Sequence, residues 1–146
     1  MIFEGRYALK ASGERLWAFI TDPTQISKCL PDLKSIESQG GDSFTAVVRI
    51  GVGPIRTDFK FKIQILNKNP TSSVQLNAVG SGSGSRITIS TPIELKQLSD
   101  GCELSYRADV TVGGMMASLG QRVMNDTAEK MISAVFQCVK SQVEHA

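Results

Sequence analysis

The chain has 146 residues, of which 41% are hydrophobic and 21% are charged, and its formal net charge is +2. This length and composition are typical of an ordinary globular domain with a sizeable core, and not of a disordered chain or a membrane-embedded bundle. The Lys and Arg residues are scattered, which argues against the concentrated basic face of a nucleic-acid-binding protein.

The termini and the cysteines indicate a protein of the reducing cytoplasm. Charged residues within the first ten positions interrupt the apolar core that a secretory signal needs, and no run of about 20 apolar residues is present to span a bilayer. Cys29, Cys102 and Cys138 are odd in number, widely spaced and without a CxxC motif. This pattern favours neither a disulfide framework nor a zinc site.

The first third of the chain predicts one strand and two short helices. Apolar and charged residues alternate over 2–10, which is the pattern of a half-buried strand. Ser12 is suited to cap a helix that Pro23 should end. The segment 24–33 is predicted to form one or two further helical turns before Pro31.

From residue 34 onward the sequence predicts six antiparallel strands in a meander. The clearest is TDFKFKIQIL at 57–66, where apolar and polar side chains alternate strictly. We expect GVGPI at 51–55 to break or bulge the pairing. The last strand is predicted to direct the following side chains inward: Cys102, Leu104, Tyr106, Ala108, Val110 and Val112.

The run GSGSGS at 80–85 is predicted to be a hairpin in that meander. It lacks the strand-then-helix context of a dinucleotide loop and the Lys of a Walker loop. As a linker it would leave each half with too few strands to close a core. We therefore expect small side chains here because another element lies close against the sheet, and we predict one domain over residues 1–146.

The C-terminal segment is predicted to be one long amphipathic helix over 118–143, with Ser118 and Gln121 as a capping box. Such a helix is roughly 39 Å long and crosses a sheet completely. The predicted fold is α+β, with a curved seven-stranded antiparallel sheet and the last helix across its concave face. A straight helix on a curved sheet leaves a cavity between them.

The order of these elements, and four segments in particular, resemble a known family. The segments are LWAFITDPTQISKCLPDL at 16–33, VRIGVGPIRTDFKFKI at 48–63, GSGSGS at 80–85 and SYRADVTVGGMMASLGQRVM at 105–124. They resemble the CoxG family, which takes its name from a component of carbon monoxide dehydrogenase, within the START/Bet v 1-like helix-grip (SRPBCC) superfamily. The match covers nearly the whole chain.

The resemblance implies a non-catalytic accessory protein of a molybdenum hydroxylase that holds a quinone-like apolar molecule. It also implies a role in maturing that enzyme or recruiting it to the inner face of the membrane. Many relatives end in a membrane-anchoring segment. This chain stops at Ala146, so we expect at most a peripheral membrane contact.

The predicted ligand-binding residues are apolar side chains of the inner sheet face, the segment before Pro31 and the Met-rich C-terminal part. They are Leu30, Phe59, Phe61, Ile63, Leu76, Ile89, Leu104, Tyr106, Met115, Met116, Val123, Met124 and Met131. Tyr106 is the one polar candidate, because its hydroxyl could bond a ligand carbonyl. The alternatives are that the methionines only fill the core and that Tyr106 bonds backbone or water.

No catalytic or metal-binding residue is predicted. The carboxylates of Asp58, Glu94, Glu103 and Asp109 fall on the solvent phase of their strands, and Cys102 shares the core phase. The leading hypothesis is therefore a binding module for a hydrophobic small molecule, with no covalently bound cofactor.

Two other functions stay open. One is an interaction protein with a filled interior that docks an enzyme or a membrane, and the other is a small cyclase or hydratase that uses Tyr106. A homodimer is a further assembly that the sequence leaves open.

Overall fold

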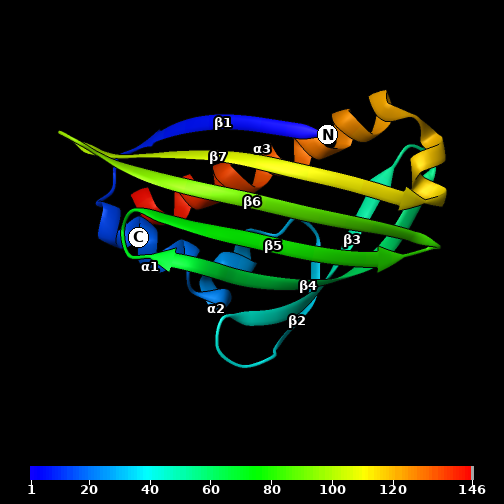
Figure 1. Ribbon diagram of the computed structural model, residues 1–146, viewed down its shortest axis with the longest axis horizontal. Helices are drawn as coiled ribbons and strands as arrows, with labels where there is room; N and C mark the ends of the chain where they lie inside the picture. The colour runs from blue at the N-terminus through cyan, green and yellow to red at the C-terminus, as the bar shows by residue number, and fades with distance from the viewer. Residues whose placement is uncertain (146) are drawn as a thin grey trace.

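A seven-stranded antiparallel sheet curves around a long C-terminal helix in the computed structural model, which describes residues 1–145 (Figure 1). The strands follow the order β1-β7-β6-β5-β4-β3-β2, so β2 to β7 form the predicted meander and β1 pairs with β7. The strands are β1 (Ile2–Leu9), β2 (Leu33–Ser38), β3 (Ser43–Val52), β4 (Ile55–Asn69), β5 (Ser73–Gly82), β6 (Ser85–Leu98) and β7 (Gly101–Gly114). The predicted helix-grip fold class is confirmed.

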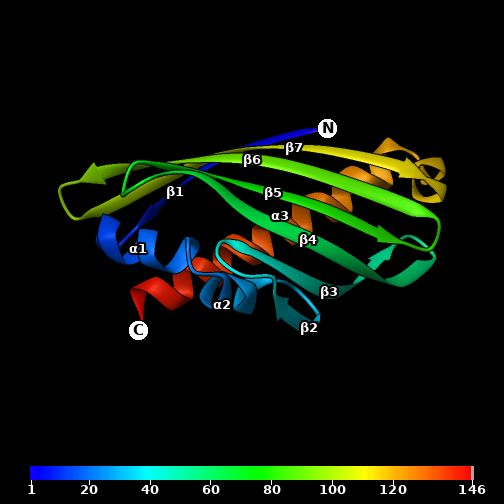
Figure 2. The ribbon, with the colours of Figure 1, turned by 60° about the horizontal axis from the view of Figure 1, so that its bottom comes forward.

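The helices lie on one side of this sheet, as Figure 2 shows most clearly. They are α1 (Gly13–Ile20), α2 (Pro23–Ile26), the 3-10 turns η1 (Ser27–Cys29) and η2 (Met115–Leu119), and α3 (Gln121–Glu144). The Ser12 side chain accepts a hydrogen bond from the Arg15 amide and caps α1 as predicted. Asp22 caps α2 in the same way, and Pro23 occupies its first turn, where no amide hydrogen is needed.

The start of α3 differs from the prediction. The Ser118 hydroxyl donates to the Met115 carbonyl at 2.6 Å, so it closes the η2 turn and does not cap the helix. Gly120, with a φ of +91°, separates η2 from α3, which begins at Gln121. The predicted capping box is therefore wrong, because the chain needs a glycine in the left-handed region to turn onto the sheet.

The glycine run is part of the sheet, as the ends of β5 and β6. Gly80 and Gly82 face the adjacent strand β4. A Cβ at Gly80 would overlap the Phe61 ring, and a Cβ at Gly82 would overlap the Asp58 carbonyl oxygen and crowd the Phe59 ring. The hairpin prediction is confirmed, and the expected close element is η2, which lies against Gly84 and bonds to Ser85 through the Met116 amide. At Gly80 and Gly82 the space is taken instead by the adjacent strand β4.

The segment 51–55 does not break the pairing. Gly51 pairs with Arg56 and Val52 with Ile55, so the β3–β4 ladder continues up to a tight turn. Gly53 occupies that turn with a φ of +58°, a conformation that suits glycine. The predicted break or bulge is therefore wrong.

Cys29 and Cys138 form a disulfide, with their Cα atoms 5.4 Å apart. The prediction against a disulfide is therefore wrong. The two residues are 109 positions apart, and the fold brings η1 against the side of α3. Cys102 is the free cysteine among the described residues and is buried in the core as predicted, where burial raises the pKa of its thiol.

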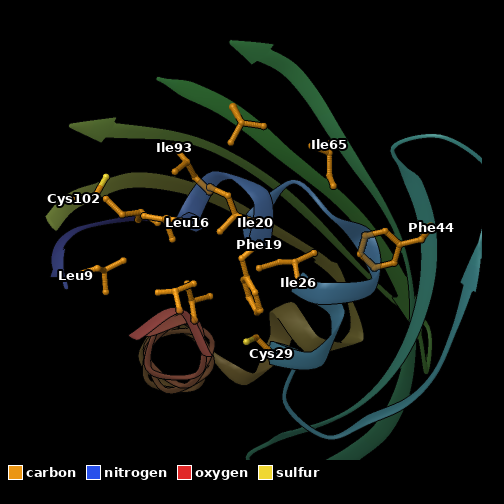
Figure 3. Close-up of a cluster of buried hydrophobic side chains, with 14 of the residues drawn as sticks. Leu9, Leu16, Phe19, Ile20, Ile26, Cys29, Phe44, Ile65, Ile93 and Cys102 are labelled. Carbon is orange, nitrogen blue, oxygen red and sulfur yellow. The ribbon is translucent and has the colours of Figure 1, made fainter. Parts of the chain in front are cut away.

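The solid part of the core lies where α1 and α2 pack between the sheet and the C-terminal half of α3. Figure 3 shows this cluster, with Leu16 and Ile20 of α1 near Ile93 of the sheet and Phe19 pointing toward Cys29. A second cluster lies under the other half of the sheet and includes Phe59, Phe61 and Met116. No helix within residues 1–145 is long and apolar enough to cross a bilayer.

Candidate functional site: an apolar cavity under the sheet

A cavity of about 280 Å³ lies between the concave face of the sheet, α3 and the segment around η1. Its position follows from the two patterns in the sequence. The inward phase of each strand is apolar, and α3 presents apolar residues at spacings of three and four toward the sheet. Because the sheet is curved and α3 is straight, the sheet and the helix do not pack along their whole lengths, and the cavity lies in the space between them.

The cavity wall includes most of the predicted ligand-binding residues. These are Leu30, Phe61, Ile63, Leu76, Ile89, Tyr106, Met116, Met124 and Met131. They come from the segment after η1, from the four neighbouring strands β4 to β7, and from η2 and α3. That any of them contacts a ligand stays a prediction.

Four of the predicted residues lie elsewhere. Phe59 is fully buried beside Gly82, and Leu104 is fully buried between β1 and β6, so both fill solid core. Met115 is 65% exposed at the β5–β6 hairpin, and Val123 packs beside Gly53 of the β3–β4 turn. The alternation correctly gave the inward phase of the two buried residues, but it does not distinguish core from cavity wall.

Several cavity residues were not predicted, although the sequence carried a signal for them. Phe44, Val48 and Ile50 share the inward phase of β3, and Val135 and Val139 continue the apolar stripe of α3. Ile26 and Pro31 also line the cavity, as expected for the segment before Pro31. Extending the same periodic patterns along each whole element would have found them.

Three aromatic rings are stacked at one side of the cavity. The ring centroid of Phe136 in α3 lies 4.9 Å from that of Tyr7 in β1 and 4.5 Å from that of Tyr106 in β7, and the two tyrosine centroids are 6.2 Å apart. The planes differ by 18° and 20°, so the contacts are stacked. Gly5 makes room for this arrangement, because a Cβ there would stand 2.7 Å from the Tyr106 ring.

Tyr106 is the ionisable side chain at the cavity wall. Burial raises the pKa of its hydroxyl, and the neighbouring Tyr7 and the Glu129 carboxylate raise it further. The hydroxyl therefore keeps its proton at neutral pH and can act as a hydrogen-bond donor. The Thr127 hydroxyl, also at the wall, is already bonded to the Val123 carbonyl at 3.0 Å.

Charged side chains are kept away from the cavity. Among the described residues, no Asp, Glu, Lys, Arg or His lines it. Asp58 is exposed and forms an ion pair with Arg49 at 3.3 Å, and Glu94 and Asp109 are also exposed. Residues 1–145 also contain no group of acidic, His and Cys side chains suited to hold a metal ion. The arrangement favours the binding of apolar matter by shape.

The sequence matches the family model for CoxG, described as a subunit of carbon monoxide dehydrogenase, over residues 5–144. The chain belongs to the CoxG family. A search of curated proteins gave no match. Among solved structures, this CoxG chain is similar to a conserved protein from Geobacillus kaustophilus, with 28% identity, a TM-score of 0.89, and 98% and 95% of the two chains covered.

More distant structures share the fold of this CoxG chain. A START superfamily protein from Mycobacterium smegmatis has 12% identity and a TM-score of 0.73, with 98% of this chain and 97% of that chain covered. The ZhuI aromatase/cyclase from Streptomyces sp. R1128 has 11% identity and a TM-score of 0.73, with 99% and 93% covered. At these identities the likeness establishes the START-like architecture alone.

Proposed function

We propose that this CoxG chain is a non-catalytic accessory protein that binds an apolar small molecule, such as a quinone or a lipid, between the sheet and α3. One observation carries the proposal: the space enclosed by the fold is lined almost entirely by apolar side chains, with no charged side chain from the described residues. Such a wall offers no acid–base pair and favours an apolar guest.

The size of the cavity limits the guest. A volume of about 280 Å³ is near the lower end of ligand pockets, which span about 300–1,000 Å³. It suits one ring system or a short chain segment, with any longer tail leaving through the opening. Each 100 Å² of apolar surface removed from water contributes about 2.5 kcal/mol, so a few hundred Å² offset the cost of association.

Tyr106 gives this proposal a polar contact, and the other polar side chains that line the cavity are Asn77, Thr91 and Thr127. Tyr106 lines the cavity, and its protonated hydroxyl is suited to donate to a carbonyl oxygen, such as that of a quinone. The bond would orient a guest that is otherwise held by shape.

The family name supports the second part of the proposal, a partner enzyme. A molybdenum-containing oxidoreductase of the carbon monoxide dehydrogenase type is the proposed partner, and the bound molecule would pass to or from it. We place this exchange on the cytoplasmic side, near the membrane in which quinones and lipids reside.

Two alternatives make different predictions. An interaction protein without a ligand needs an interior filled by side chains, and the cavity weighs against it. A cyclase would need Tyr106 as an acid, so Tyr106→Phe should abolish turnover of a cyclase substrate. Under the binding proposal the same change weakens affinity only several-fold.

The experiment compares two alanines on α3. Ala128 lines the cavity, whereas Ala134 is exposed on the same helix. Ala128→Phe should fill the space and weaken binding of a 1,4-naphthoquinone and of the neutral probe N-phenyl-1-naphthylamine at least tenfold, while Ala134→Phe should leave it unchanged. Equal binding by both variants would overturn the proposal. It would also be overturned if the organic extract of the purified protein contains no bound guest and added quinones do not bind.

A further inference from the structure

We propose that the Cys29–Cys138 pair is a reversible thiol–disulfide site that controls access to the cavity, with a dithiol reductant as its reaction partner. This inference rests on the proposed binding function. The first observation is the bond itself, which joins the last residue of η1 to the middle of the C-terminal half of α3.

The bond connects two walls of the cavity. On one side, Ile26, Leu30 and Pro31 flank Cys29 and line the cavity. On the other side, Val135 and Val139 flank Cys138 and line it from α3. We call residues 23–33 the lip. The disulfide fixes the distance between the lip and α3, the two walls that it joins.

Few other interactions hold the middle of the lip to α3. Its far end is fixed to the sheet, where the Arg49 amide donates to the Asp32 carbonyl at 3.1 Å and Leu33 pairs with Val48. Apart from contacts of the cysteine sulfurs, no hydrogen bond or ion pair joins the lip to α3 within residues 1–145. Without the disulfide, only apolar packing closes this side of the cavity.

The two sulfurs differ in access, which sets the order of the reaction. Cys29 is 4% exposed, whereas Cys138 is partly exposed on the helix. A thiolate of the reductant attacks the Cys138 sulfur, the S–S bond breaks, and Cys29 leaves as a thiolate that takes up a proton. The second thiol of the reductant then attacks the mixed disulfide, releases Cys138 as a thiol, and leaves the reductant oxidised to its own disulfide. The buried Cys102 stays outside this exchange.

The expected consequence is a change in exchange kinetics. With the bond intact, the lip and α3 are held together and the guest leaves slowly. After reduction the lip can separate from α3 between its anchors at α1 and β2, and the guest should leave at least tenfold faster. Disulfides that form in reducing compartments are usually of this transient, redox-sensing kind.

The test uses the full chain with N-phenyl-1-naphthylamine as probe. Its dissociation rate is measured by stopped-flow fluorescence with and without dithiothreitol, for the wild type, Cys102→Ser and the double variant C29S/C138S. We expect a tenfold acceleration by dithiothreitol in the wild type and Cys102→Ser, and a fast rate without any response in the double variant. Equal rates in all states, or a response that persists in the double variant, would refute control of access by the disulfide while leaving the binding proposal intact.

A second measurement stands independently of any ligand. Hydrogen exchange of the lip amides should accelerate on reduction, while the amides of β4 and β5 keep their protection. If hydrogen exchange of the lip amides is unchanged on reduction, control of access by the disulfide is refuted, even if the probe fails to bind or the double variant fails to fold. Thiol titration of the denatured protein, without prior reduction, should find one free thiol. If three free thiols remain after mild oxidation, the disulfide does not form and the proposal is refuted.

Discussion

Gly80 stands directly opposite Phe61 in the β4–β5 ladder, and the Phe61 ring covers the place where a side chain at residue 80 would stand. Gly80→Val should therefore lower the free energy of unfolding by about 1–3 kcal/mol, because the ring must move out of a packed position. Ser81→Val, on the outward face of the same strand, should change it by less than about 0.5 kcal/mol. Urea unfolding of the two variants gives the comparison, and equal stabilities would contradict the packing described.

Phe136 joins α3 to the sheet through its two tyrosine neighbours. Phe136→Leu removes both stacked contacts and should cost about 1–3 kcal/mol. Because Phe136 also lines the cavity, the variant should accept a bulkier naphthoquinone than the wild type does. Gln137→Leu, at the next and exposed position, is the control for both measurements. A fully stable variant with unchanged guest selectivity would show that the stack contributes little.

Ser85 holds η2 against the β5–β6 hairpin. Its hydroxyl accepts a hydrogen bond from the Met116 amide at 2.8 Å in a buried position. Ser85→Ala leaves that amide without its partner and should lower the unfolding free energy by about 1–3 kcal/mol. Ser83→Ala removes an exposed hydroxyl contact with Thr57 and should cost much less. The difference between the two variants in thermal or urea unfolding tests the assignment.

The pH dependence of stability should reveal the environment of Tyr106. The native pKa of its hydroxyl is raised by burial, so the native state keeps a proton that the unfolded chain releases at about pH 10. The stabilisation is therefore complete below that pH and is lost as pH rises through the native pKa. Relative to Tyr106→Phe, the wild type should lose stability only in this alkaline range. A constant difference between the two proteins across that range would argue against the buried position.

Periodicity in the sequence was enough to predict the sheet, its inward faces and the long helix. Each of these depends on local alternation, as in 57–66, or on local caps such as Ser12. The same information did not show that Phe59 fills the solid core whereas Phe61 lines the cavity, because both side chains point to the same face of β4. The cavity wall is determined by sheet curvature and by the position of α3, and both are properties of the assembled chain.

The misjudged disulfide has a related cause. Cys29 and Cys138 lie 109 residues apart, and no local pattern near either one indicates the other. Their meeting depends on how η1 packs on α3. The start of α3 was misplaced because Ser118 has the residue type of a cap but serves the preceding turn.

The pairing of β1 with β7 has a consequence for biosynthesis. β1 leaves the ribosome well before its neighbour in the sheet, β7, which begins at Gly101. At translation rates of about 5–20 residues per second, it waits on the order of ten seconds for that neighbour. α3 emerges later still, so until then the inner face of the growing meander is open to its surroundings. A hydrophobic cargo could thus be enclosed as the nascent polypeptide completes itself.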